Sequence, residues 1–174
     1  IIVDDHSTDG TADLLAAVCA ENPWIVHLRV EEKQARAVGS KVAKLFLWGL
    51  SQASVSWDFC SKIDADLTLP QDYFERIFAA FSRGPELGIA SGGCYDRLGE
   101  ELRLERVAPG HTRGALKTYR RTCYEQMGGV RGVHGWDGID NIMAQMLGWT
   151  TRNFPEIVVE HHRPTGSFEG RLKG

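Results

Sequence analysis

Two groups of carboxylates have a spacing that suits metal or nucleotide binding. Asp64 and Asp66 are separated by one residue, and Asp4 and Asp5 are adjacent near the beginning of the chain. In an extended segment, residues two apart point to the same side, so Asp64 and Asp66 can present two carboxylates to one ligand. Asp4 and Asp5 point in opposite directions. Paired oxygen ligands suit Mg²⁺ or Mn²⁺, but a single Asp-x-Asp also occurs in turns and at helix starts, which leaves both interpretations open.

Alternating strand and helix patterns place both acidic groups at strand ends. The predicted strands are Ile1–Asp4, Ile25–Val30, Trp57–Ile63, Gly88–Ser91, Ala115–Tyr119 and Glu156–Glu160. Apolar residues with helical spacing lie between them, at Leu14–Val18, Val38–Phe46, Phe74–Phe81 and Ile139–Met146. This order predicts an α/β fold with a mostly parallel sheet and helices on both faces. In such folds, ligands bind beyond the carboxyl ends of the strands.

The composition is that of an ordinary globular domain and excludes several classes of protein. The chain has 174 residues, of which 43% are hydrophobic and 25% charged, and its net charge is -3. These values exclude a disordered chain, a disulfide scaffold and an overall basic nucleic-acid-binding domain. Residues 45–57 form the longest uncharged stretch, which is too short to span a bilayer. The four cysteines form no CxxC pair, so we expect small buried residues in a reducing compartment.

Five segments resemble, in order, the motifs of family 2 glycosyltransferases. Residues 1–11, with the sequence IIVDDHSTDGT, resemble the VDDxSTDGT signature, and Lys62–Asp66 resembles the strand-terminal Asp-x-Asp of the family. Gly114–Arg121 and the pair Gly128-Gly129 are similar to its acceptor-side stretch, in which a strand ends in Arg-Arg and a helix and a Gly-Gly turn follow.

The last two motifs lie in the final quarter of the chain. Residues 135–140, GWDGID, resemble the GW-ED-xD segment, and His161-His162-Arg163 resembles a late metal-binding histidine motif. The resemblance covers nearly the whole chain. It implies a GT-A fold, with residues 1–91 as the nucleotide-sugar-binding half and residues 92–174 as the acceptor-side half of one domain. The family's first strand does not precede the VDD segment here, so we expect a chain that is incomplete at both ends.

The implied reaction transfers a sugar from a nucleoside diphosphate donor to a hydroxyl, with inversion, in glycan or polysaccharide synthesis. The resemblance favours Asp5 over Asp4 as the residue that accepts the N3–H of uracil, a hydrogen bond that cytosine cannot donate. A UDP-type donor is therefore favoured, with Asp64 near the ribose. The alternative for Asp4 and Asp5 is a turn that leads into the first helix.

The resemblance also implies a bound Mn²⁺ or Mg²⁺ ion. Asp66 would be its direct ligand, and either His161 or His162 would complete the ligand set. Adjacent residues on a strand point to opposite faces, so only one of the two histidines can reach the ion. The ion would stabilise the leaving diphosphate. An exposed or core histidine is the alternative for each.

Asp137 is the expected base that removes the proton from the acceptor hydroxyl. Trp136 would stack on a sugar, and Asp140 would contact the acceptor. The sequence departs from the family at this point, because Asp137-Gly138 replaces the Glu-Asp pair and the second carboxylate is either absent or moved to Asp140. A first-turn helix acid is the alternative for Asp137, and a core residue is the alternative for Trp136.

The acceptor and the location are the least specific expectations. Residues 97–121 carry seven bases against three acids, which suits a phosphate-bearing lipid or glycan acceptor. The expected partners are a nucleotide-sugar donor and a glycan or lipid-linked acceptor, without nucleic acid. The expected location is the cytoplasm, with peripheral association at the inner face of the membrane as the alternative.

Three other functions compete with transfer. Asp64–Thr68 also matches the Asp-x-Asp-x-Thr motif of haloacid-dehalogenase-type phosphatases, but that motif ends the first strand of its fold, whereas two β-α units precede it here. A sugar-phosphate nucleotidyltransferase would need a Gly-rich loop after its first strand, and the sequence shows no such loop. The third alternative is a degenerate module that binds nucleotide or sugar without activity.

Overall fold

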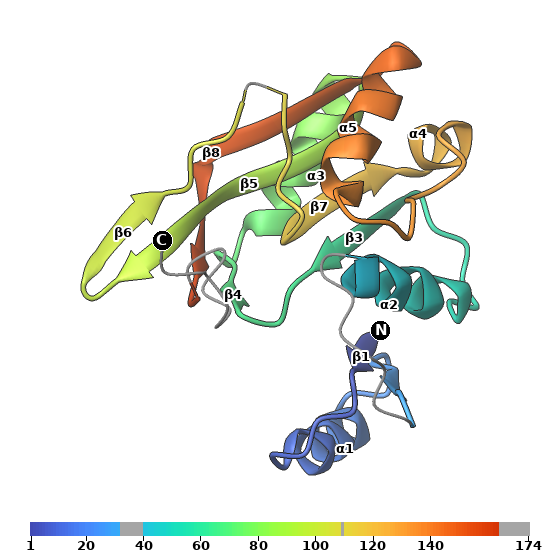
Figure 1. Ribbon diagram of the computed structural model, residues 1–174, viewed down its shortest axis with the longest axis vertical. Helices are drawn as coiled ribbons and strands as arrows, with labels where there is room; N and C mark the ends of the chain where they lie inside the picture. The colour runs from blue at the N-terminus through green and yellow to red at the C-terminus, as the bar shows by residue number, and fades with distance from the viewer. Residues whose placement is uncertain (32–39, 109, 164–174) are drawn as a thin grey trace, which may run out of the picture. The chain divides into compact units, whose positions relative to one another are not determined.

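The computed structural model describes residues 1–31, 40–108 and 110–163 (Figure 1). The chain forms two compact units. Unit 1 contains Ile1–Ser56 and Val130–Trp136, and unit 2 contains Trp57–Gly129 and the chain from Asp137 onward. The predicted boundary between residues 91 and 92 does not coincide with these units, and the division into donor and acceptor halves stays a prediction.

Unit 1 is a β-α-β motif with a second helix. Strand β1 (Ile2–Asp4) pairs in parallel with β2 (His27–Arg29), and α1 (Thr11–Glu21) connects them. Helix α1 follows Gly10, whose φ of 83° lies in the left-handed region that glycine adopts without a steric penalty. Helix α2 (Ser40–Ser51) and residues 130–136 also belong to this unit. The predicted strands Ile1–Asp4 and Ile25–Val30 are confirmed, each somewhat shorter than expected; Val38 lies outside the described residues.

Unit 2 is built on one six-stranded sheet. Its strands are β3 (Phe59–Ile63), β4 (Leu67–Thr68), β5 (Leu87–Leu98), β6 (Glu101–Leu104), β7 (Leu116–Arg120) and β8 (Thr150–His161). Their order across the sheet is β3-β7-β5-β8-β4, and β6 pairs with β5. Its helices are α3 (Tyr73–Arg83), α4 (Arg121–Gln126) and α5 (Trp136–Met146). Trp136, the first residue of α5, is assigned to unit 1.

The predicted α/β class is confirmed, and the strand directions in unit 2 are mixed. The long strands β5 and β8 are parallel, whereas β3–β7, β5–β7, β5–β6 and β4–β8 are antiparallel. The β5–β6 pair is antiparallel because a tight turn at Gly99, with a φ of 66°, joins the two strands directly. Strands β4 and β6 are absent from the sequence prediction because segments of two and four residues carry little periodic pattern.

The helices of unit 2 cover both faces of its sheet (Figure 1). Helix α3 buries Tyr73, Ile77, Ala80 and Phe81, which lie on one side of a helix because of their spacing. They pack in the core with Leu116 of β7 and with residues of β5 and β8. Burial of each large apolar side chain contributes about 1.5–3 kcal/mol. Because side chains alternate along a strand, the residues next to Leu116 point to the opposite face, which α5 covers.

Two further findings concern the cysteines and the membrane. All four cysteines are free; Cys94 and Cys123 are buried as predicted, whereas Cys19 and Cys60 are partly exposed. Burial raises the pKa of the Cys94 and Cys123 thiols to about 12. Among the helices in the described part of the chain, none combines the length and apolar character needed to cross a bilayer.

Candidate active site

The Asp-x-Asp motif follows β3, and the sheet brings it beside the late histidines. The backbone N–H of Asp64 donates to the carbonyl oxygen of Ala115 at 2.8 Å, which extends the β3–β7 pairing. The short strand β4 then pairs with the end of β8, with Leu67 opposite His161. The carbonyl oxygen of Asp66 accepts a hydrogen bond from the backbone N–H of His162 at 3.0 Å. The two motifs, far apart in sequence, therefore meet at one end of the sheet.

His161 lies between two carboxylates at this end of the sheet. Its Nε2 atom is 3.7 Å from Oδ1 of Asp66, and its Nδ1 atom is 3.4 Å from Oδ1 of Asp96. Asp96 lies on β5 directly opposite His161 in the parallel β5–β8 register. Glu105 follows β6, and its backbone N–H donates to the Cys94 carbonyl oxygen at 2.9 Å. One ligand atom from each of Asp96, Glu105 and His161 lies within 4.8 Å of the others.

The donor set of this cluster fits a divalent cation. Oδ1 of Asp96, Oε2 of Glu105 and Nδ1 of His161 are buried, and within the described ranges none of these atoms has a hydrogen-bond partner. Buried polar atoms are normally paired, because an unpaired one loses its interactions with water without compensation. Carboxylate oxygens and an imidazole nitrogen are ligands that Mn²⁺ accepts, and the carboxylates also suit Mg²⁺.

His162 points away from this cluster. Its Nε2 atom is 2.7 Å from the hydroxyl of Thr68, and its Nδ1 atom is 3.3 Å from a carboxylate oxygen of Glu160. The His162 side chain is 47% exposed. Of the two histidines, His161 is therefore the one that lies beside Asp66, and its role as a metal ligand stays a prediction.

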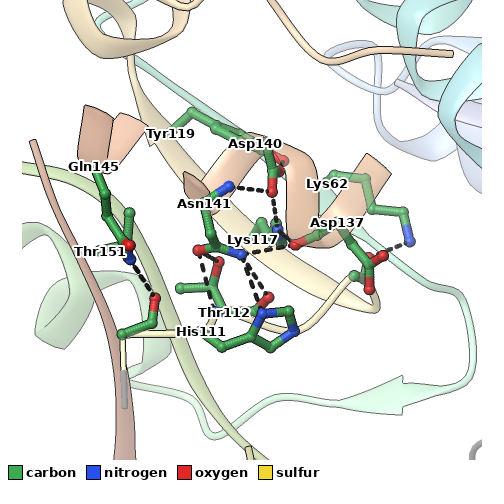
Figure 2. A network of polar contacts seen from close by, with 12 residues as sticks. Lys62, His111, Thr112, Lys117, Tyr119, Asp137, Asp140, Asn141, Gln145 and Thr151 are labelled. Carbon is green, nitrogen blue, oxygen red and sulfur yellow. Dashed lines mark hydrogen bonds and ion pairs between the residues drawn. The ribbon is translucent and has the colours of Figure 1, made fainter. Parts of the chain in front are cut away.

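Lys62 connects the Asp-x-Asp motif to the region of Asp137. Its buried ammonium donates hydrogen bonds to Oδ1 of Asp64 and, at 2.7 Å, to the carbonyl oxygen of Gly114. The Asp137 carboxylate lies against the same glycine, since a Cβ atom on Gly114 would come within 2.8 Å of Oδ2 of Asp137. Figure 2 shows the side chains of Lys62 and Asp137 next to each other. The predicted base and the first Asp of the motif thus share one neighbourhood.

A buried polar network holds the first turn of α5 (Figure 2). Lys117 Nζ donates to Oδ1 of Asp140 at 2.6 Å and to the Asp137 carbonyl oxygen at 2.5 Å. The hydroxyl of Tyr119 donates to Oδ2 of Asp140 at 2.6 Å, and Asn141 Nδ2 donates to the Asp137 carbonyl oxygen at 2.7 Å. Lys117 and Tyr119 are two residues apart on β7, so both point toward α5. The network fixes the backbone of Asp137 and leaves its carboxylate out of these bonds.

The comparison with known families identifies the chain. The sequence profile described as "Glycosyl transferase family 2" matches residues 1–134. The chain belongs to this family. The resemblance inferred from the motifs is confirmed, and the phosphatase and nucleotidyltransferase alternatives have no support. Trp136, Asp137, Asp140, His161 and His162 lie beyond the matched residues, so the family match does not test their roles.

Solved structures of other proteins confirm the GT-A fold of this family 2 chain. One is the mannosyltransferase PcManGT from Pyrobaculum calidifontis, in complex with GDP-Man and Mn²⁺; its TM-score is 0.65 at 20% sequence identity, over 95% of this chain and 48% of that protein. Another is GalNAc-T7 with UDP, GalNAc and Mn²⁺. Its TM-score is 0.70 at 12% sequence identity, over 92% of this chain and 37% of that protein. The family 2 chain thus spans less than half the length of these structures.

The structure corrects the expectation that Asp140 contacts the acceptor. Asp140 is only 2% exposed, and both its carboxylate oxygens accept hydrogen bonds from Lys117 and Tyr119. Burial raises the pKa of Asp140, an effect that the Lys117 ammonium opposes, and burial also lowers the pKa of Lys117. Asp140 therefore positions α5 in this family 2 chain. A lysine inside a predicted strand was the sequence signal for such a buried partner.

The side chain of Trp136 has little surface for stacking. Trp136 is 4% exposed, which agrees with the alternative of a core tryptophan. An acceptor sugar would find no open indole face in this conformation of the family 2 chain.

In unit 1, the two carboxylates of the VDD signature have different environments. Asp4 is buried, and its Oδ1 atom accepts a hydrogen bond from the backbone N–H of Ser7 at 2.8 Å. Hydrogen bonding to the side chain of Ser7 is the main cause of the lowered pKa of Asp4, an effect that burial opposes. The Asp4 Oδ2 atom is 3.7 Å from Nε of Arg29. Asp5 is more exposed and forms an ion pair with Lys41 of α2 at 2.5 Å. Asp4 thus stabilises the turn after β1, and Asp5 remains the accessible residue of the pair.

Removing the buried ammonium of Lys117 is expected to destabilise unit 2. Lys117→Met should lower the free energy of unfolding by about 3–5 kcal/mol, because Asp140 would keep a buried carboxylate without its cation. Urea denaturation measures this change. The exposed Lys44→Met is the control, with an expected change within about 0.5 kcal/mol. The double variant Lys117→Met/Asp140→Leu should recover much of the loss, and equal losses for Lys117→Met and Lys44→Met would contradict the role of the pair.

Proposed function

We propose that this chain is the catalytic portion of a metal-dependent, inverting glycosyltransferase that uses a nucleoside diphosphate sugar. The observation that carries the proposal is the position of His161 beside Asp66, with Nε2 and Oδ1 3.7 Å apart at one end of the unit 2 sheet. This distance is longer than a hydrogen bond and suits two ligands of one ion. Membership of glycosyl transferase family 2 supports the same reaction class.

Asp66 and His161 are the proposed cation ligands. When bound, the ion would neutralise the charge that develops on the leaving diphosphate. The solved proteins PcManGT and GalNAc-T7 both contain Mn²⁺, which supports Mn²⁺ as the first ion to test. One of them was solved with a guanosine nucleotide and the other with a uridine nucleotide, so they do not decide between donors. The preference for UDP rests on Asp5 and its resemblance to the family signature.

Asp137 is the proposed base. Its backbone carbonyl oxygen is held by Lys117 and Asn141, and its carboxylate lies against Gly114 outside that network. A base must be held in place while its carboxylate remains able to accept a proton. Lys62 donates hydrogen bonds to Asp64 and to the Gly114 carbonyl oxygen. The resemblance to the family motif supports a position of Asp64 near the donor ribose.

Most cations of the basic stretch at residues 97–121 have partners in the described part of the chain. Arg97 pairs with Glu160, Arg113 with Glu105, Lys117 with Asp140 and Arg121 with Glu125, while Arg120 donates to backbone carbonyl oxygens. The charge count therefore gives weaker support to a phosphate-bearing acceptor than the sequence indicated. A glycan or lipid-linked acceptor and a cytoplasmic location, with peripheral membrane association as the alternative, remain predictions.

Metal removal tests the proposed function. The whole protein that carries this chain should hydrolyse or transfer from a nucleotide sugar in the presence of Mn²⁺, and EDTA should remove this activity until Mn²⁺ is restored. A panel of UDP- and GDP-sugars, assayed by release of the nucleoside diphosphate, identifies the donor. Full activity in EDTA would contradict a metal-dependent mechanism. Nucleotide binding without turnover on any donor would instead support the degenerate binding module.

A further inference from the structure

We propose that Asp96 is a positioning residue that orients the imidazole of His161 and selects its tautomer. The proposal rests on the proposed function, because it takes Asp66 and His161 as ligands of the same cation. Asp96 itself would remain outside the ligand set. It would act through a hydrogen bond from Nδ1–H of His161.

The backbone brings Asp96 and His161 together. They are Cα partners in the parallel pairing of β5 with β8, and their side chains face each other with Oδ1 and Nδ1 3.4 Å apart. His161 is 7% exposed. Both facing atoms are buried, and among the residues that the structure describes they have no other hydrogen-bond partner. A small rotation of either side chain would convert this approach into a hydrogen bond.

The chemistry of imidazole links this contact to the cation. A neutral histidine carries a proton on one ring nitrogen and a lone pair on the other. When Nδ1 carries the proton and faces Asp96, Nε2 presents its lone pair toward Asp66, where the cation is proposed to bind. The opposite tautomer would direct a lone pair at the buried Oδ1 atom of Asp96, which is unfavourable. Carboxylates in this position orient ligating histidines in many metal sites and strengthen metal binding.

Glu105 is the competing partner for the same nitrogen. Its ligand atom belongs to the same cluster, and Asp96, Glu105 and His161 could together hold a cation at Nδ1 instead of Nε2. However, the other oxygen of Glu105 forms an ion pair with Arg113, which brings a positive charge into this cluster. Glu105 is thus already engaged by Arg113, whereas Asp96 lies in direct register with His161. Glu105→Gln is therefore the variant that distinguishes the two arrangements.

Mn²⁺ binding by the whole protein, measured by isothermal titration calorimetry, is the first test. Asp96→Ala should weaken Mn²⁺ affinity by about 10–100-fold, the range typical of residues that support a metal ligand. Asp96→Asn should restore much of the affinity, because its amide oxygen can still accept the Nδ1–H bond. Glu105→Gln should lose less affinity than Asp96→Ala, because Glu105 takes no part in orienting His161 in this arrangement. Equal losses in Glu105→Gln and Asp96→Asn would show direct coordination by both carboxylates and would overturn the proposal.

The tautomer of His161 is the second test, and a purely structural role of Asp96 would not change it. Nitrogen-15 NMR of the histidine side chains, without metal at a pH where the imidazole is neutral, should show His161 with its proton on Nδ1. Asp96→Ala should remove this preference, and an unchanged tautomer would overturn the proposal. Failure of the wild-type protein to bind Mn²⁺ would instead contradict the proposed function. The tautomer measured without metal would still show whether Asp96 accepts the Nδ1–H bond of His161.

Discussion

Asp66→Asn is expected to abolish the Mn²⁺-dependent binding of nucleoside diphosphate. The substitution keeps the size of the side chain but removes the negative charge that lies 3.7 Å from His161 Nε2. Loss of a direct carboxylate ligand should exceed the 10–100-fold effect of a supporting residue, so we expect a loss of more than about 100-fold in Mn²⁺ affinity. Calorimetric titration with Mn²⁺, and then with UDP in the presence of Mn²⁺, measures both steps.

A matched aspartate in unit 2 controls for the change of charge. Asp72 is exposed at the start of α3, and its carboxylate lies 4.0 Å from Arg76, a surface pair that contributes little. Asp72→Asn should therefore bind Mn²⁺ and UDP as the wild-type protein does. If Asp66→Asn bound Mn²⁺ and UDP as the wild-type protein does, Asp66 would be excluded as a metal ligand. The proposal that Asp66 and His161 bind the same ion would then be wrong.

Asp137→Asn is expected to lose turnover while it retains donor binding. An amide cannot accept the proton of the acceptor hydroxyl, and removal of a general base typically costs about 10²–10⁴-fold in rate. The fold should persist, because Lys117 and Asn141 bind the backbone carbonyl oxygen of Asp137 and not its carboxylate. Steady-state kinetics with the donor and acceptor of the whole protein, together with UDP titration in Mn²⁺, separate the two effects.

The outcome for Asp137 also decides between the enzyme and the inactive binding module. Unchanged turnover in Asp137→Asn would exclude it as the base and would favour the alternative of a first-turn helix acid. A simultaneous loss of UDP binding and thermal stability would instead show a structural role. Asp72→Asn, measured in the same assays, accounts for nonspecific effects of a lost surface charge.

The regular elements were predictable where local periodicity is strong. The core of α3 follows from apolar residues at helical spacing, and β3 follows from an apolar run that ends at the Asp-x-Asp motif. Strands β5 and β8 extend well beyond their predicted segments, to Leu87–Leu98 and Thr150–His161. Their added residues carry no alternation of their own, and pairing with each other keeps them extended.

The candidate site was predictable only in part. The rule that ligands gather at strand ends, together with the family motifs, indicated Asp64, Asp66 and a late histidine. The sequence could not distinguish His161 from His162, since adjacent residues are equivalent until the register is known. It also gave no indication of Asp96, which carries no motif and reaches His161 only through the β5–β8 pairing.

The direction of a helical side chain is the other property that the local sequence left open. Asp137 and Asp140 lie on the same short helix, and either could have faced an acceptor. The packing of α5 on β7 places Asp140 on Lys117 and Tyr119 and leaves the Asp137 carboxylate outside that network.

The sequence by itself determined the family, the α/β class and the types of residue available for metal and proton chemistry, because these depend on local patterns and motif order. The tertiary structure decided which histidine lies beside Asp66, which carboxylate is buried and which one faces His161. These outcomes depend on strand register and on helix packing between distant segments, and a shift of one residue in either would exchange the side chains that face each other.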